Sequence, residues 1–516
     1  MNDNMSEQTN NKTIAKNTIF LYIRMMVTMA VSLYTSRVIL QVLGVDDYGI
    51  YQAVGGIVGF LGFMNAAMSA GSSRFITFGL GERDEVKLKK IFSTTLTGHI
   101  ILALLIVVIA ETAGLWFLHN KMVIPPDRLN AAQWVFHLAV LTAFFKLTQV
   151  PYNACIIAHE KMSVYAYISI IEAVLKLIIV YLLTIGHMDK LILYAILLAL
   201  LQLSILTYYR FYCVCRFVEA HFRLSIDKKL FKEIAGFSSW SLFANGSIAL
   251  NSQGILILLN MFFAPSVVAA RAISLQVNSA ANQFVNNFQT AANPQIVKLY
   301  AAKDYEKSKQ LLLQTTRFSF YLMLLLSLPI CMTAEPLLKL WLGIVPEYSV
   351  IFLQIIVVQS LFHVFDVSFY RALFAKGQLR ENALISPTLG FIQFPIVYVL
   401  FKMGCSPVVL SWASLVTTIL LGLVIKPILI IKIVNYTWAD ILSVFKPCLF
   451  VTLCSIPMPV TAYILLPNTD NVLLYFFCMV LLCVMSSALA CWYVGIDKPL
   501  RRKIKEDLKK KIVQTN

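Results

Sequence analysis

The chain has 516 residues, of which 59% are hydrophobic and 13% are charged, and its net charge is +17. Soluble domains carry about 25% charged residues, so the composition excludes a soluble enzyme with a single membrane anchor. Residues 1–16 are polar, so we expect no cleavable signal peptide and a first span that stays in the mature protein. The ten cysteines lie mostly in apolar segments, and their spacing predicts no metal site and no cofactor.

Fourteen apolar segments in the chain are each about 20 residues or longer, which is enough to cross a bilayer. The sequence therefore predicts an all-α polytopic membrane protein. The predicted limits of the spans are 17–42, 48–73, 91–118, 131–157, 163–186, 190–215, 235–262, 267–293, 309–333, 348–374, 383–402, 406–432, 441–466 and 471–494.

The basic residues predict the orientation of these spans. With the N-terminus inside, 30 of the 43 Lys and Arg residues fall in cytoplasmic tails and loops, five on the opposite side and eight within spans. This is a strong positive-inside bias, and an even number of spans places both termini in the cytoplasm. We interpret the basic tail 495–516 as a segment beside anionic lipid headgroups, and we expect no nucleic-acid partner.

A weak internal repeat suggests two similar halves. Ile179-Val180-Tyr181 matches Ile396-Val397-Tyr398, and Arg83-Asp84 matches Lys303-Asp304 at nearly the same offset. The period covers six spans, which predicts two parallel six-helix lobes related by an axis along the membrane normal. The predicted parts are an N-terminal tail (1–16), an N-lobe (17–217), a linker (218–234), a C-lobe (235–432), two further spans (441–494) and a basic tail (495–516).

The stretch 238–295 is unusually polar for a membrane segment. It holds 22 Ser, Thr, Asn or Gln residues among 58 and one charged side chain, Arg271. Two helical faces concentrate these groups within arcs of about 60° and 80°. The first face carries Ser238, Ser241, Asn245 and Ser252, and the second carries Asn278, Asn282, Asn286, Gln289 and Asn293. Such faces line a water-filled cavity or hold helices together by hydrogen bonds; we favour the cavity.

One motif resembles a known family. The stretch Leu43-Gly44-Val45-Asp46-Asp47-Tyr48-Gly49-Ile50-Tyr51, with Ser73-Arg74-Phe75-Ile76 after it, is similar to the first helices of Wzx-type polysaccharide flippases. These belong to the multidrug/oligosaccharidyl-lipid/polysaccharide exporter superfamily. The resemblance implies a MATE-like, V-shaped pair of lobes that alternates between inward-open and outward-open states.

The same resemblance implies a function and a place in the cell. It implies the transfer of an undecaprenyl-pyrophosphate-linked oligosaccharide across the bacterial cytoplasmic (inner) membrane, for O-antigen or capsule biosynthesis. The implied partners are this lipid-linked oligosaccharide, membrane lipids, and a polysaccharide polymerase with other assembly proteins.

A pyrophosphate within the membrane calls for arginine or lysine, because guanidinium–phosphate pairing is strong. The embedded candidates are Arg24, Arg37, Arg74, Lys146, Lys176, Arg271, Arg317 and Arg371. We assign the pyrophosphate to Arg24 and Arg271, and the glycan to Asn282, Asn286 and Gln289. Further candidates for substrate binding are Arg37, Arg74 and Asn278. The alternative is that the arginines stabilise helix ends. We expect Arg371 to reach the membrane surface by snorkelling.

Three titratable groups are candidates for proton coupling. His363 and Asp366 lie three residues apart on one span, where they could bind and release protons or form a passive hydrogen bond. Glu172 precedes Lys176 by four residues, so this pair could neutralise itself.

The sequence also bears on alternatives to this function. The chain has no Walker motif, and its outward loops are too short for a catalytic domain, so we expect a transporter and no enzyme. The alternatives are a drug or cation exporter of the same superfamily, a flippase for the peptidoglycan lipid precursor, and a membrane polysaccharide polymerase or ligase. A cationic, amide-rich interior favours the anionic glycolipid over a drug.

Overall fold

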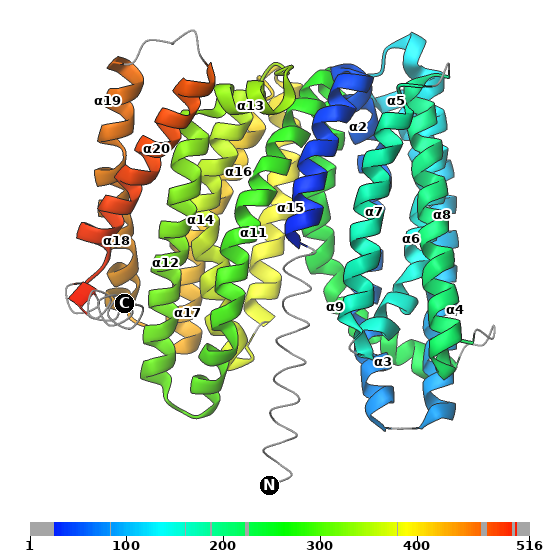
Figure 1. The fold of residues 1–516 in the computed structure, drawn as a ribbon. Coiled ribbons are helices and arrows are strands. Elements are labelled where there is room, and N and C mark those ends of the chain that lie inside the picture. The colour runs from blue at the N-terminus through cyan, green and yellow to red at the C-terminus, as the bar shows by residue number, and fades with distance from the viewer. Residues whose placement is uncertain are drawn as a thin grey trace, which may run out of the picture. The chain divides into compact units, whose positions relative to one another are not determined.

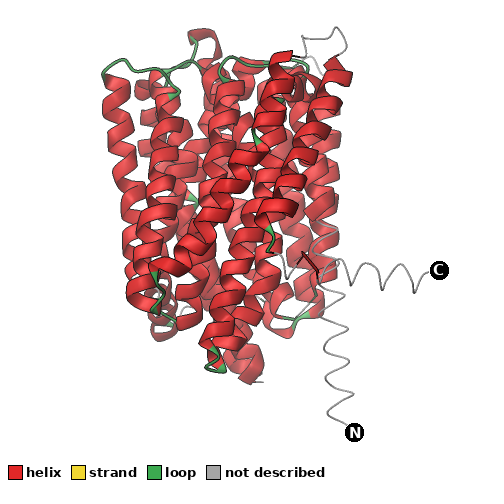
Figure 2. Cartoon of the chain, turned by 90° about the vertical axis from the view of Figure 1, so that its left-hand side faces the viewer, coloured by secondary structure: helices red, strands yellow, loops and turns green. Residues whose placement is uncertain are grey.

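The structure is a computed structural model that describes residues 25–82, 84–159, 161–185, 188–221, 227–378, 380–465, 472–497 and 501–502. All regular structure in these ranges is helical, and no strand occurs in them (Figure 2). The prediction of an all-α fold is confirmed for the described part of the chain. The helices form two compact units, which are taken in turn below.

Unit 1 contains the described residues up to Ala272, together with Gly390–Lys402 (Figure 1). Its first helices are Met25–Leu43, α2 (Val45–Leu61), α3 (Phe63–Glu82), α4 (Glu85–Ile109), η1 (Ala110–Gly114) and α5 (Leu115–Lys121). They are followed by η2 (Pro126–Arg128), α6 (Leu129–Ala158), α7 (Met162–Leu182), α8 (Lys190–Arg216), η3 (Val218–Ala220), α9 (Lys228–Ala249), η4 (Leu250–Gly254) and α10 (Ile255–Phe262).

Unit 2 contains Ile273–Leu389 and the described residues from Met403 onward. Its helices are α12 (Tyr305–Met332), α13 (Ala334–Leu342), α14 (Ser349–Lys376), α16 (Val409–Ile419), η5 (Leu420–Ile425), α17 (Lys426–Val434), α18 (Trp438–Ser455), α19 (Pro457–Leu465), α20 (Val472–Ala490) and η6 (Cys491–Gly495). Two long helices, α11 (Pro265–Ala301) and α15 (Arg380–Lys402), each contribute residues to both units.

Eleven helices in the described residues are long and apolar enough to cross a membrane. Each falls on one of the predicted spans, and examples are Lys190–Arg216 for 190–215 and Ser349–Lys376 for 348–374. The other three predicted spans are also helical, in α2 with α3, in α9–η4–α10 and in α11, but they are not among the eleven. Two of these helices, α2 with 17 residues and α10 with 8, are apolar but short, whereas α11 is long and polar. Fourteen crossings therefore remain a prediction.

Each unit has its own apolar core. In unit 1, α6 packs against α2, α4 and α8, around side chains such as Phe136 and Leu118 that are fully buried. In unit 2, α12 and α14 pack together, and α18 and α20 cover the other side of α12. Helices in a bilayer associate through close packing, and small residues let their backbones approach. The predicted lobe boundaries remain predictions.

Candidate functional site

The predicted amide face of α11 packs against α14 within unit 2. Asn282 donates a side-chain N–H to the hydroxyl of Ser360 at 3.1 Å, and that hydroxyl donates to Oδ1 of Asn278 at 2.5 Å. Both asparagines are half-buried, whereas Asn286, one turn further along, is exposed. On this face, Asn278 and Asn282 therefore make contacts with α14, whereas the amide of Asn286 is accessible.

Gln289, a further member of this face, lies within the interior of unit 2 and is only 1% exposed. Its side-chain amide donates to Ser368 Oγ at 2.9 Å. Its backbone carbonyl accepts from Arg371 at 2.9 Å, and its Oε1 accepts from the same guanidinium at 3.3 Å. Arg371 is itself buried, so it ties α14 to α11 and does not snorkel as the sequence suggested.

The four arginines that are candidates for substrate binding have different surroundings. Arg24 lies outside the described residues, and the structure describes only the backbone of Arg74. Arg37 is half-buried on the helix Met25–Leu43. Arg271 is 3% exposed, so protein encloses its side chain in this conformation. Arg271 belongs to unit 1, whereas Asn278 and the later amides belong to unit 2.

A lysine in the middle of α6 makes no direct polar contact with a described residue. Lys146 is exposed, and no hydrogen bond or ion pair joins it to any residue that the structure describes. It lies about 18 Å along the helix axis from Ala158, the last residue of α6. Around the helix it lies about 140° from Leu141, an apolar side chain that is exposed. Asn153 lies only about 20° away from it. Lys146 therefore projects from the polar side of α6.

Two charges on α7 surround this lysine. Glu172 and Lys176 form an ion pair at 2.6 Å, as their spacing predicted. Lys146 is repelled by Lys176 and attracted by Glu172. Because Glu172 is already paired, the three side chains carry one net positive charge. A cluster of this kind attracts an anion.

A second charged cluster joins three helices of unit 2. The carboxylate of Asp366 on α14 lies 3.6 Å from His363 Nδ1, as expected for neighbours one turn apart, and 2.9 Å from Nζ of Lys426. The side chain of Lys426 is 3% exposed and also donates to Oδ1 of Asn382 on α15. Its ammonium lies over the ring of Tyr370, 5.4 Å from the centroid. Asp366 is thus paired mainly with a lysine.

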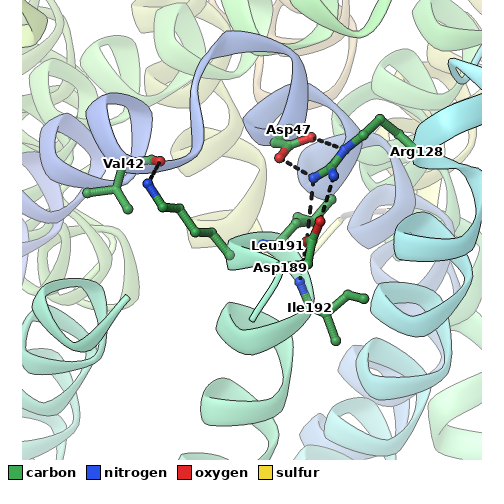
Figure 3. Close-up of polar contacts among 7 residues, drawn as sticks. Val42, Asp47, Arg128, Asp189, Leu191 and Ile192 are labelled. Carbon is green, nitrogen blue, oxygen red and sulfur yellow. Dashed lines mark hydrogen bonds and ion pairs between the residues drawn. The ribbon is translucent and has the colours of Figure 1, made fainter. Parts of the chain in front are cut away.

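The family-like motif at the start of α2 binds one arginine (Figure 3). Asp47 accepts from Nε of Arg128 at 2.8 Å and also from its NH2 group. Asp189, the N-cap of α8, accepts from the same guanidinium at 2.6 Å. Arg128 follows α5 in the chain and precedes α6, so one side chain connects the starts of α2, α6 and α8. In the predicted orientation this end of unit 1 faces outward.

The two carboxylates around Arg128 titrate differently. Burial raises the pKa of Asp47 above its usual value, although Arg128 opposes the shift. Burial acts in the same direction on Asp189, but Arg128 and the backbone N–H groups of Ile192 and Leu191 outweigh it and lower its pKa. Asp189 is therefore the carboxylate whose charge stabilises the folded state.

The glycine of the same motif brings α2 against the turn between α10 and α11. A Cβ added at Gly49 would lie 1.9 Å from the backbone oxygen of Pro265. Close by in the chain, Asn260 and Val123 exchange hydrogen bonds at 2.9 and 3.2 Å. The motif thus packs against the α10–α11 turn within unit 1, which is a structural role that the resemblance did not imply.

Lys426 and Arg128 are the charged residues that sequence reasoning missed. Lys426 lies within the predicted span 406–432, and this position is a sequence signal for an embedded group. Arg128 lies between the predicted spans 91–118 and 131–157, in an outward loop of the predicted topology. Its link to Asp47 spans 81 positions and has no local sequence signal.

Known structures with a similar fold are transporters. The chain superposes on the lipid II flippase MurJ in its inward closed conformation with a TM-score of 0.70 at 13% identity, covering 92% of this chain and 98% of that one. An inward-facing multidrug resistance MATE family transporter of the MOP superfamily gives 0.66 at 15% identity, covering 81% and 99%. A MOP superfamily transporter from Pyrococcus furiosus gives 0.59 at 16% identity, covering 82% and 97%.

The chain has the fold of MOP superfamily transporters. The predicted MATE-like fold is confirmed at this level. No protein-family model matches the sequence, and no curated protein matches it significantly.

Proposed function

We propose that this chain is a Wzx-type flippase that moves an undecaprenyl-pyrophosphate-linked oligosaccharide from the inner to the outer leaflet of the bacterial cytoplasmic membrane. It works by alternating access and serves surface polysaccharide biosynthesis, such as that of O-antigen or capsule. The observation that carries the proposal is Lys146, a mid-helix ammonium with no partner among the described residues. An unpaired charge at this depth is costly and marks a functional site.

The anionic pyrophosphate supplies the negative partner that the ammonium of Lys146 lacks. We place it at Lys146 with Lys176, and we retain Arg24, Arg37, Arg74 and Arg271 as further contacts along its path. The glycan needs several neutral donors and acceptors, each worth about 1 kcal/mol. The exposed amide of Asn286 suits it best, followed by the half-buried Asn278 and Asn282. Gln289 becomes a glycan contact only if α11 and α14 separate.

Proton coupling through Asp366 and His363, with Glu172 as a second candidate, completes the proposed cycle. Asp366 lies between two basic groups, so a proton added to its carboxylate weakens both contacts at once. Asp366→Asn is then expected to abolish gradient-driven transport while leaving substrate binding intact. Unchanged transport in vesicles of this variant would reduce the pair to a passive contact.

The second candidate function is export of drugs or organic cations. The likeness to multidrug transporters supports it, and the likeness to the lipid II flippase supports a lipid-linked substrate. The flippase covers 92% of this chain and the multidrug transporter 81%, which favours the glycolipid. The positive charge at Lys146 and Lys176 also opposes a cationic substrate.

Binding to the purified protein distinguishes the two. A short-chain prenyl-pyrophosphate oligosaccharide and a fluorescent organic cation are titrated against the wild type, Lys146→Met and Lys146→Arg. We expect binding of the glycolipid, with affinity weaker by about 10-fold or more in Lys146→Met, since a charge-assisted contact is worth about 1.5–3 kcal/mol. Lys146→Arg should keep most of it. Binding of the cation alone, unaffected by Lys146→Met, would support the drug exporter instead.

A further inference from the structure

Lys426 sits in surroundings that suit a bound cation. Its ammonium contacts the carboxylate of Asp366 at 2.9 Å and the amide oxygen of Asn382, and it lies over the face of Tyr370. Ser386 contributes a hydroxyl group that donates to the same Asn382 oxygen at 3.1 Å. Asp366, Asn382 and Tyr370 stabilise positive charge directly, through oxygen lone pairs or through the ring quadrupole, and Ser386 holds the Asn382 oxygen in place.

Local structure fixes Lys426 at this point. The π-helical segment η5 ends at Ile425, so Lys426 is the first residue of α17. A Cβ added at Gly422 in η5 would lie 2.6 Å from the backbone oxygen of Phe362. The missing side chain lets η5 approach the backbone of α14 closely, and this brings Lys426 within reach of Asp366. π-Helical segments of this kind are frequent at functional sites.

Two basic groups lie near the carboxylate of Asp366: the ammonium of Lys426 at 2.9 Å and the imidazole of His363 at 3.6 Å. Only the ammonium also contacts Asn382. Asp366 carries the only acidic side chain that contacts Lys426 among the described residues, and the other contacts are neutral. Without the lysine, the groups left behind would be one carboxylate oxygen, one amide oxygen and one hydroxyl. Hard oxygen ligands with a single negative charge match a monovalent metal cation.

We propose that Lys426 is a built-in cation that occupies a monovalent-cation site formed by Asp366 and Asn382, with Ser386 positioning the Asn382 side chain. The site then needs no Na⁺ or K⁺ while the lysine is in place, and unit 2 of the transporter is independent of these ions. Removal of the ammonium converts the same groups into a binding site for Na⁺ or K⁺. This inference does not depend on the identity of the transported substrate.

Thermal unfolding of the purified protein tests the proposal. The wild type and Lys426→Met are titrated with NaCl or KCl against choline chloride at constant ionic strength. Choline is too large for the site and controls for salt. We expect no specific effect of Na⁺ or K⁺ on the Tm of the wild type and a saturable rise of several degrees in Lys426→Met, because a ligand that binds only the folded state stabilises it.

Two further variants make the result specific. Lys426→Arg keeps the positive charge and should remain insensitive to Na⁺ and K⁺. The double variant Lys426→Met with Asp366→Asn lacks the carboxylate and should lose the sensitivity. A Lys426→Met protein whose Tm ignores both ions would overturn the proposal and leave a simple ion pair.

The wild type gives an independent test if Lys426→Met does not fold. A specific Na⁺ or K⁺ stabilisation of the wild type that disappears in Asp366→Asn would show that a free ion already binds beside Lys426, which also overturns the proposal. The absence of any such stabilisation, with Lys426→Arg behaving like the wild type, supports it. Neither outcome depends on the flipping assay, so the proposed function stands or fails separately.

Discussion

The guanidinium of Arg371 holds both the backbone and the side chain of Gln289, through contacts of 2.9 and 3.3 Å. One residue of α14 thus fixes one residue of the polar helix α11 within the interior of unit 2. The polar stretch was interpreted either as the lining of a cavity or as interhelical hydrogen bonding. Its face on α11 does both, since Gln289 is buried in helix packing and Asn286 is accessible.

The first prediction separates Gln289 from Asn286. Gln289→Ala should lower stability by about 1–3 kcal/mol, because it removes an acceptor from the buried Arg371 and a donor from Ser368. Asn286→Ala should change stability by less than about 0.5 kcal/mol, as is usual for accessible side chains, and should alter which glycan is preferred. Denaturant unfolding in detergent and transport of two glycans measure the two effects. If Gln289→Ala is as stable as the wild type and its glycan preference is altered, the prediction is wrong and Gln289 binds the glycan.

The second prediction concerns the glycine of the motif. Gly49→Ala should destabilise the protein by about 1–3 kcal/mol, because its Cβ would overlap the backbone of Pro265 and force α2 away from the α10–α11 turn. Gly55, two turns later on the same helix, is the matched control, since a Cβ there meets nothing within 4 Å. Gly55→Ala should be neutral or stabilising by up to about 1 kcal/mol. Equal effects in thermal unfolding would show that the close contact does not matter.

The third prediction is a pH dependence at Arg128. Asp189 has a lowered pKa in the folded state, so its charge stabilises the protein above its unfolded pKa of about 3.9. This stabilisation is lost as the pH falls through the lower, folded value. Asp189→Asn removes the charge but keeps the helix N-cap, because asparagine caps about as well as aspartate. The variant should be less stable than the wild type by about 1 kcal/mol near neutral pH.

The pH profile provides the check on this prediction. The difference between the wild type and Asp189→Asn should shrink towards zero in acid, because both proteins are then uncharged at this position. A difference that is constant with pH would assign the effect of the substitution to packing. Asp47 should behave oppositely, since a raised pKa means that folding disfavours its charged form.

The sequence alone predicts where the helices lie in the chain, but it does not predict the contacts between them. Apolar length located the eleven strongly apolar helices to within a few residues at most of their ends, since each must match the thickness of a bilayer. The polar helices α9 and α11 were found through their amides. The division of those amides between packing and exposure depends on where α14 lies, which no local pattern records.

The sequence mainly failed to predict ion pairs between helices that are far apart in the chain. The sequence indicates Asp366 as a proton-coupling candidate because an acid within a span is rare. In the structure its nearest basic partner is Lys426, 60 positions away in the chain. His363 was chosen on spacing alone, and it lies further from the carboxylate than the lysine does. Lys146 was recognised as an embedded charge, yet only the structure showed that it lacks a partner.

The central claim is that the chain moves a pyrophosphate-linked oligosaccharide, and translocation in reconstituted vesicles tests it most directly. Two unrelated undecaprenyl-pyrophosphate glycans are supplied on one side, and their arrival in the other leaflet is measured per folded molecule of wild type, Lys146→Met and Lys146→Arg. We predict that the wild type moves both glycans, that Lys146→Met slows both about 10-fold or more, and that Lys146→Arg retains most activity. A wild type that moves neither glycan, or a Lys146→Met variant as active as the wild type on both, would contradict the account.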